Sequence, residues 1–219
     1  LTKSYFNNVD QQNILFGNDF FRLDGELTRE GNDNSDSAYH ITYKLPPNKR
    51  KELIVNNVVI PKLSDHIGNF PCIIISPDDN QLILGSSEER RKFLDATISQ
   101  GNHQYLEWLI VYTKLLAQRN AALKRFAETK KTDRQLIETY DKQLIPLGTN
   151  IYEARKVVSG KLQIIFKSFS KDISLERESV SFSYSSQLND KPLSEMLANS
   201  FEKDSLVQRG HFGTRRGRL

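Results

Sequence analysis

The sequence predicts an α+β protein, in which a β-rich N-terminal part is followed by a pair of long antiparallel helices. Up to about residue 80, apolar and polar residues alternate in short runs that end at turns, a pattern typical of strands. From Ser86 onward, apolar residues recur at spacings of three and four, which indicates helices packed along one stripe. A short polar tip at residues 129–132 separates the two longest helical stretches, so they should run antiparallel.

The β-rich part begins with two alternating segments, residues 20–27 and 39–45, which predict strands exposed on one face. Residues 52–60 predict a hairpin that turns at Asn56-Asn57, because asparagine tolerates the left-handed conformation that tight turns require. Together these segments predict a sheet.

The run Phe-Pro-Cys-Ile-Ile-Ile at residues 70–75 is continuously apolar, as expected for a strand that is buried on both faces. It would bury Cys72, the single cysteine of the chain, which excludes an internal disulfide. A thiol enzyme built on Cys72 is therefore the least favoured functional class, since thiol reactivity requires an exposed, electropositive setting.

Three helices follow. Ser86 or Ser87 can cap the first, which begins at Glu88. The second covers residues 103–128, and its apolar seam has one slot that is filled by a charge, Arg119, which we expect to be buried against a carboxylate of the facing helix. Asp133 caps the third, at residues 133–169, and its seam repeats at alternating steps of three and four: Ile137, Tyr140, Leu144, Leu147, Ile151, Ala154 and Val158.

Three further features complete the secondary-structure prediction. Pro146 lies inside the third helix and predicts a kink or a restart there. Residues 180–184 alternate like a strand, and Pro192 opens a short helix that ends near Phe201. The tail, residues 206–219, is rich in arginine.

The composition sets limits on the function. The net charge of +4 and pI near 9.0 permit contact with nucleic acid without requiring it. The four histidines are scattered, which argues against a metal site, and Gly85-Ser86-Ser87 lacks the lysine of a phosphate-binding loop. No apolar stretch is long enough to span a bilayer, so we expect no membrane contact.

Four ordered motifs carry a family resemblance, and the first of them consists of three strings. Residues 75–79, 82–86 and 90–95 read ISPDD, LILGS and RRKFLD, and residues 118–124 and 140–147 read QRNAALK and YDKQLIPL, with Lys3-Ser4-Tyr5 near the N-terminus. This arrangement resembles the RecF family of bacterial recombination-repair ATPases over nearly the whole chain. The motif residues are Ser76, Pro77, Gly85, Ser86, Arg90, Arg91, Phe93, Leu94, Asp95, Gln118, Arg119 and Asn120.

The resemblance implies part of an ABC-type head at residues 1–85, a helical arm at 86–205 and a basic segment at 206–219 that returns to the head. It also implies a cytoplasmic protein that binds ATP and Mg²⁺, dimerises with ATP, and acts at single-strand gaps in DNA with RecO and RecR. The phosphate loop, signature and Walker B segments would lie outside this sequence, so the chain alone should neither bind nor hydrolyse ATP and has no catalytic residue. The tail from Gly213 to Leu219 departs from the family pattern.

Candidate site residues follow from both lines of reasoning. Asp78 lies in a region that resembles the Q-loop of ABC heads, with a plain turn as the alternative. Arg90 and Arg91 could contact phosphate, or pair with a nearby acid such as Asp95. The candidate DNA-binding residues form two basic groups, for which a solvated surface is the alternative: Lys44, Lys49, Arg50 and Lys51 in the first, and Lys124, Arg125, Lys130 and Lys131 in the second.

A non-enzymatic coiled-coil adaptor that binds only protein remains the competing function. The two functions differ in their response to salt, because binding to DNA weakens steeply as ionic strength rises.

Overall fold

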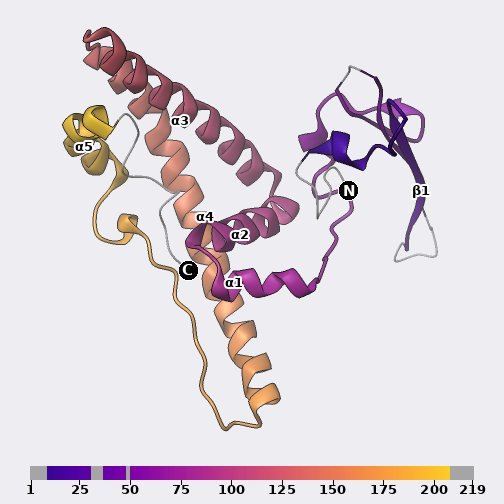
Figure 1. The fold of residues 1–219 in the computed structure, drawn as a ribbon. Coiled ribbons are helices and arrows are strands. Elements are labelled where there is room, and N and C mark those ends of the chain that lie inside the picture. Colours follow the sequence, from indigo (N-terminus) through magenta and orange to yellow (C-terminus); the bar gives the residue numbers. More distant parts are fainter. Residues whose placement is uncertain (1–8, 31–36, 48–49, 208–219) are drawn as a thin grey trace. The chain divides into compact units, whose positions relative to one another are not determined.

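The computed structural model describes residues 9–30, 37–47 and 50–207, and the chain divides into two compact units, residues 1–70 and 71–219 (Figure 1). The first unit contains the sheet and the second contains the long helices. Each unit has a hydrophobic core of its own.

The sheet has four antiparallel strands in the order of the sequence. Their bounds are β1 Phe21–Arg29, β2 Ser37–Leu45, β3 Glu52–Val55 and β4 Val58–Val59, with short 3-10 helices at Asp10–Asn13 and Leu63–His66. Leu23 lies opposite Tyr43, and Thr42 lies opposite Ile54. Asn56 and Asn57 have φ of 47° and 66°, so both central residues of the predicted hairpin turn are left-handed. The three predicted strand regions are confirmed.

The core of the first unit lies under the middle of the sheet. Ile41, Tyr43 and Leu53 are buried there. The side chains that pack around them come from the strands and the segment that follows: Phe21, Leu27, Tyr39, Val55, Ile60, Leu63 and Phe70. Burial of aromatic and β-branched side chains stabilises this small sheet.

The predicted buried strand at residues 70–75 is wrong. These residues have no regular secondary structure, and Ile73 and Ile75 are 90% and 86% exposed. A strand requires a neighbour that pairs with its backbone, and no described segment pairs with this one. The thiol of Cys72 is consequently exposed rather than buried, and the Cys72 amide donates to the side chain of Gln100 at 2.9 Å.

The second unit is built from helices. Their bounds are α1 Gln81–Leu84, α2 Ser87–Gly101, α3 His103–Thr129, α4 Arg134–Ser174 and α5 Leu193–Val207, with 3-10 turns at Pro77–Asn80 and Gln187–Asn189. Ser86 caps α2 by accepting from the Glu88 amide, and Asp133 caps α4 by accepting from the Leu136 amide. Both predicted caps are confirmed. Residues 130–133 join α3 to α4, and the two helices pack against each other (Figure 1).

The predicted seams face the core of this unit. Tyr105, Tyr112 and Leu116 of α3 are buried together with Leu144 and Ile151 of α4. Toward the tip a second cluster joins Leu123 and Phe126 to Ile137.

The α4 helix runs without interruption from Arg134 to Ser174, so Pro146 causes no restart. The missing proline amide removes one hydrogen bond from the helix. Leu144 and Ile151, on either side of this position, are both buried against α3 and its neighbours, and this packing keeps the helix continuous.

After α4 the chain runs back beside that helix (Figure 1). The strand predicted at residues 180–184 is not formed. The Phe182 carbonyl instead accepts from the Gln163 side chain at 2.8 Å, and the Phe182 ring lies edge-on to Phe166. These contacts place the segment against α4. The final helix, α5, extends past the predicted end at Phe201 to Val207, and the tail residues 208–219 lie outside the described residues.

Candidate functional site

Two of the motif residues, Asp95 and Arg119, lie in clusters around buried arginines of the helical unit. Arg155 of α4 contacts Asp95 of α2 and Tyr105 of α3, and we call these three residues the Arg155 cluster. Arg119 of α3 contacts Asp141 of α4 and Asp204 of α5, and Ser200 of α5 contacts Asp204. We call these four residues the Arg119 cluster. Each cluster joins three helices, so it fixes how the helices pack.

In the Arg155 cluster, one guanidinium forms a fork with one carboxylate. The Arg155 Nε and Nη2 atoms donate to the two oxygens of Asp95, each at 2.8 Å, and the Tyr105 hydroxyl donates to Asp95 Oδ1 at 2.5 Å. The side chain of Arg155 is 2% exposed and that of Asp95 is 18% exposed. This two-point geometry is the strong form of an arginine–carboxylate pair.

Burial and neighbouring charges both shift pKa values in this cluster. It raises the pKa of Tyr105, although the positive charge of Arg155 acts in the opposite direction. Burial by itself would lower the pKa of Arg155, but the hydrogen bond and charge of Asp95 outweigh it, and the pKa of Arg155 is raised. Arg155 and Asp95 thus form an ion pair, and the phenol of Tyr105 lies beside it.

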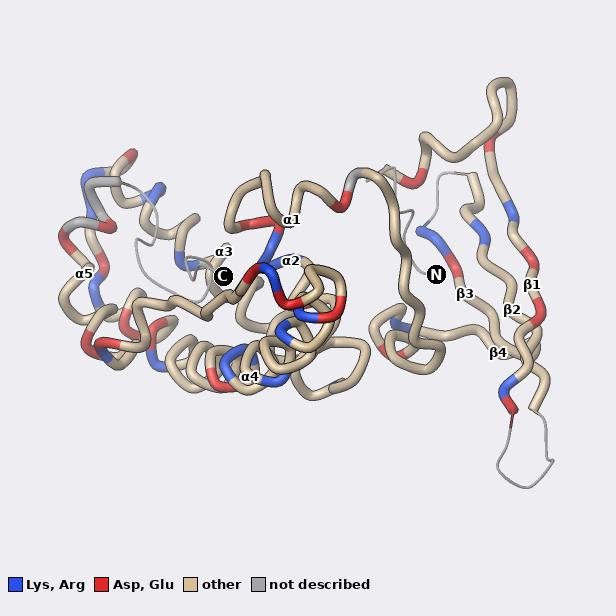
Figure 2. The backbone as a smooth tube through the Cα atoms, turned by 90° about the horizontal axis from the view of Figure 1, so that it is seen from below, with Lys and Arg blue, Asp and Glu red and all other residues tan. Residues whose placement is uncertain are grey.

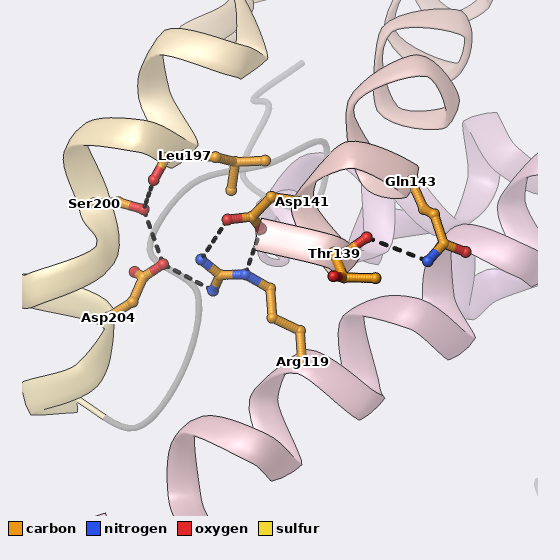
Figure 3. A network of polar contacts seen from close by, with 7 residues as sticks. All are labelled: Arg119, Thr139, Asp141, Gln143, Leu197, Ser200 and Asp204. Atoms are coloured by element: carbon orange, nitrogen blue, oxygen red, sulfur yellow. Dashed lines mark hydrogen bonds and ion pairs between the residues drawn. The ribbon is translucent and has the colours of Figure 1, made fainter. Parts of the chain in front are cut away.

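The Arg119 cluster has a different charge pattern (Figure 3). Arg119 Nε donates to Asp141 Oδ1 at 2.7 Å, and Arg119 Nη1 donates to Asp204 Oδ2 at 2.9 Å. The Ser200 hydroxyl contacts the same Asp204 oxygen at 2.9 Å. Arg119 and Asp204 are fully buried, and the side chain of Asp141 is 15% exposed. One guanidinium thus forms ion pairs with two carboxylates.

The predicted burial of Arg119 against a carboxylate of the facing helix is confirmed, since Asp141 lies on α4. The second carboxylate, Asp204 on α5, was not predicted. Burial raises the pKa of Asp141; the hydrogen bond and charge of Arg119 act against this shift, and the negative charges of Asp204 and Glu138 add to it.

The first family motif forms a compact turn before α2. Arg90 Nη1 donates to the carbonyls of Leu82 and Gly85, both at 3.1 Å. A Cβ at Gly85 would lie 2.4 Å from the Gln81 carbonyl oxygen, so this turn requires glycine. The side chain of Arg90 therefore holds this turn through hydrogen bonds to two backbone carbonyls.

The two motif arginines have different surroundings, and the negative charges of Glu88 and Asp95 act on Arg91, in line with the expected pairing with nearby acids. Arg90 binds the carbonyls just named, and Arg91 donates to the Ser87 hydroxyl at 3.0 Å. The guanidinium that forks onto Asp95 belongs to Arg155, which the sequence reasoning missed. Burial lowers the pKa of Arg91, and the nearby positive charge of Arg155 lowers it further. Phosphate contact by Arg90 or Arg91 remains a prediction.

The other motif residues are spread around these contacts. Ser76 and Pro77 begin the 3-10 turn that contains Asp78, where the Ser76 amide donates to Asp79 at 2.8 Å. Leu94 is buried, whereas Phe93 is largely exposed. Gln118 is exposed on α3, and Asn120 is half-buried. The role of Asp78 near a nucleotide stays a prediction.

The first basic group is partly neutralised by acids. Lys44 contacts Glu52 at 3.1 Å, and Lys51 contacts Asp10 at 2.9 Å and lies over the Tyr43 ring. Arg50 is exposed, and Lys49 lies outside the described residues. Paired lysines are less available to a phosphate than unpaired ones.

The second basic group lies at the tip of the α3–α4 pair. Lys124, Arg125, Lys130 and Lys131 are all exposed. Lys124 approaches Glu128 only at 3.9 Å, and within the described part of the chain neither Lys130 nor Lys131 forms an ion pair. Away from this tip, basic and acidic positions are interspersed along the helices (Figure 2).

Two absences apply to the described ranges. They contain no group of three or more histidine, cysteine, aspartate or glutamate side chains that could hold a metal ion. Among the same residues, no helix combines the length and apolar character that crossing a bilayer requires.

Comparison with known proteins identifies the chain. It is 41% identical over 202 residues to the DNA replication and repair protein RecF of Flavobacterium johnsoniae, a match that covers 92% of this chain and 55% of the relative. RecF of Cytophaga hutchinsonii is 33% identical over 213 residues, covering 97% of this chain and 55% of that protein. Over most of its length, the chain is thus homologous to curated proteins named RecF.

Solved structures agree with this assignment. A structure of the recombination mediator RecF with ATP matches with a TM-score of 0.87 at 25% identity, covering 98% of this chain and 58% of the other. A second RecF structure, with an ATP analogue, matches with a TM-score of 0.85. No family model matches the chain. The chain spans about half the length of the curated RecF proteins that it matches.

Proposed function

We propose that this chain acts in DNA repair and recombination as part of a RecF-type recombination mediator. The observation that carries the proposal is the 41% identity to a RecF protein over 92% of the chain. The shared fold, at a TM-score of 0.87, supports it independently. A cytoplasmic location, dimerisation with ATP, and partnership with RecO and RecR belong to the same proposal.

Nucleotide chemistry is proposed for the longer RecF-type protein and not for this chain alone. A phosphate loop binds the triphosphate through backbone amides and a lysine, and the sequence contains no Gly-x-x-x-x-Gly-Lys-Ser/Thr string. We expect titration of the chain with labelled ATP and Mg²⁺ to give no saturable binding in the micromolar range. Stoichiometric binding in that range would overturn this part of the proposal.

The α3–α4 tip is the proposed contact with DNA. Its lysines and arginine are exposed, whereas Lys44 and Lys51 of the other basic group are engaged by acids. Clustered bases without carboxylate partners release counterions when they meet phosphates, and this release drives binding that does not depend on sequence. The tip residues Lys130 and Lys131 should therefore contribute more than Lys44 does.

The test is binding of the chain to fluorescent gapped DNA at several salt concentrations. The variant Lys130→Gln/Lys131→Gln should bind more weakly and lower the slope of log affinity against log salt by about 1 to 2. Lys92→Gln is the matched control, because Lys92 is an exposed lysine already paired with Glu88 and Glu89. Equal effects of the two substitutions would remove the tip from the DNA interface.

A protein-binding adaptor remains the second candidate, because the seams of α3 and α4 show that much of this unit serves helix packing. Under this alternative the wild-type chain would show no salt-dependent affinity for gapped DNA. It would instead bind RecO or RecR with an affinity that Lys130→Gln/Lys131→Gln leaves unchanged.

A further inference from the structure

Helix α5 is held on the α3–α4 pair by apolar contacts and by one buried ion pair. Leu193, Met196 and Leu197 of α5 are buried, and Arg134 of α4 lies over the ring of Phe201 at 5.4 Å. Near its C-terminal end α5 also places Asp204, fully buried, on Arg119 of α3. The apolar contacts position the helix, and Asp204 brings a negative charge into the interior with it.

The arrival of that charge affects Asp141. Asp141 has Arg119 as its ion-pair partner, at 2.7 Å, and Arg119 also pairs with Asp204 at 2.9 Å (Figure 3). The charged and polar groups that face Asp141 come from three helices: Arg119 of α3, Asp204 of α5 through the shared guanidinium, and Glu138 of its own helix α4, which itself pairs with Arg134. When α5 is docked, Asp141 shares its cation.

We propose that Asp141 takes up a proton when α5 docks on α3 and α4, so that mild acid tightens the docking of α5. Proton binding and helix docking are then linked, and each favours the other. The proton comes from solvent, which the partly exposed Asp141 side chain can reach. With Asp141 neutral, Arg119 and Asp204 remain as a balanced pair.

The direction of the pH effect follows from the pKa of Asp141. With α5 docked this pKa is raised, first by burial and then by the charges of Asp204 and Glu138, against the opposing effect of Arg119. Release of α5 removes Asp204 and exposes the site, which lowers the pKa toward its ordinary value. The cost of the charged carboxylate is thus fully present above the docked-state pKa and is relieved as the pH falls through it.

Hydrogen exchange of the whole chain tests this proposal. The opening of α5, measured from its amide protection after correction for intrinsic rates, should be several-fold rarer at about pH 4.5 than at about pH 7.5. Asp141→Asn, which mimics the neutral carboxyl, should make α5 opening insensitive to pH over the same range. Glu153→Gln is the control on the same helix, because Glu153 is exposed and outside the cluster, and it should leave the pH response intact.

A second measurement locates the proton without relying on a variant that folds. The carbon-13 shift of the Asp141 carboxyl in the wild-type chain should titrate with a midpoint above the ordinary aspartate value of 3.8. A midpoint at or below that value, or α5 protection that stays constant or falls on acidification, would overturn the proposal. Titration of Asp204 in place of Asp141 would overturn it as well.

Discussion

The two buried arginines use the same side chain in different ways. Arg155 meets one carboxylate through two hydrogen bonds of 2.8 Å, and the phenol of Tyr105 completes the coordination of Asp95. Arg119 divides its donors between Asp141 and Asp204. The first arrangement balances charge within the cluster, whereas the second places two carboxylates around one guanidinium.

A buried arginine can therefore either fix how helices pack or make a site sensitive to pH. A balanced fork joins one guanidinium to one carboxylate at two points, and it is costly to break. An arginine that is shared between two acids compensates each of them less, and burial together with the neighbouring acids raises the pKa of Asp141, so this site can respond to pH. In this chain the shared arginine holds α5, and the balanced one holds α2 against α3 and α4.

The largest effect is expected from Arg119→Met. It leaves Asp141 and Asp204 buried without this cation, and breaking such a pair costs about 3–5 kcal/mol of unfolding free energy. Urea unfolding should place this variant toward the upper end of that range at neutral pH and closer to wild type in mild acid, where the carboxyls become protonated. A loss below about 1 kcal/mol would show that the cluster is not a buried ion pair.

The same chemical change in the two clusters should have unequal effects. Asp95→Asn removes the charge that balances buried Arg155 and should cost about 3 kcal/mol. Asp141→Asn removes the shared acid, so Arg119 and Asp204 remain paired and the cost should be below about 1 kcal/mol.

Urea unfolding of both asparagine variants at neutral pH measures this contrast directly. Each substitution replaces one carboxylate oxygen by an amide nitrogen, so the side-chain volume hardly changes in either variant. Equal losses of stability would remove the distinction between a balanced and a shared arginine.

The smallest effect concerns the phenol of the balanced cluster. Tyr105→Phe keeps the fork between Arg155 and Asp95 and removes two hydrogen bonds of the hydroxyl, the one of 2.5 Å to Asp95 and the one of 3.1 Å from Arg155 Nε, so it should cost about 1–2 kcal/mol. Burial raises the pKa of Tyr105, and its ionisation in the folded state should therefore lie above the ordinary tyrosine value in an ultraviolet titration. A normal titration of all eight tyrosines would contradict the burial of this phenol.

Sequence reasoning found Arg119 because a charge in an apolar seam stands out against its neighbours. Arg155 lay just outside the seam and was missed. A signal was present, since Gly148, Tyr152, Arg155 and Ser159 recur at steps of four, three and four beside the seam, and all four are buried. A second row of this kind indicates that a helix is covered on two sides, here by α3 and by α2.

The β-rich part shows where prediction of strands from the sequence succeeds and where it fails. Local alternation correctly located the strands of the hairpins, where each strand pairs with its neighbour in the sequence. For residues 70–75, hydrophobicity alone indicated a strand, but strand formation depends on a pairing partner that local sequence does not specify. Asp204 was missed for a related reason, because its contact with Arg119 joins residues 85 positions apart.

The exposure of Cys72 has a practical consequence. It is the only thiol of the chain, and Trp108 is the only indole. A maleimide dye would therefore attach at one known position without any substitution, and the indole would act as its energy-transfer donor. Both groups lie within residues 71–219, so their transfer efficiency would report on the integrity of that unit throughout an unfolding experiment.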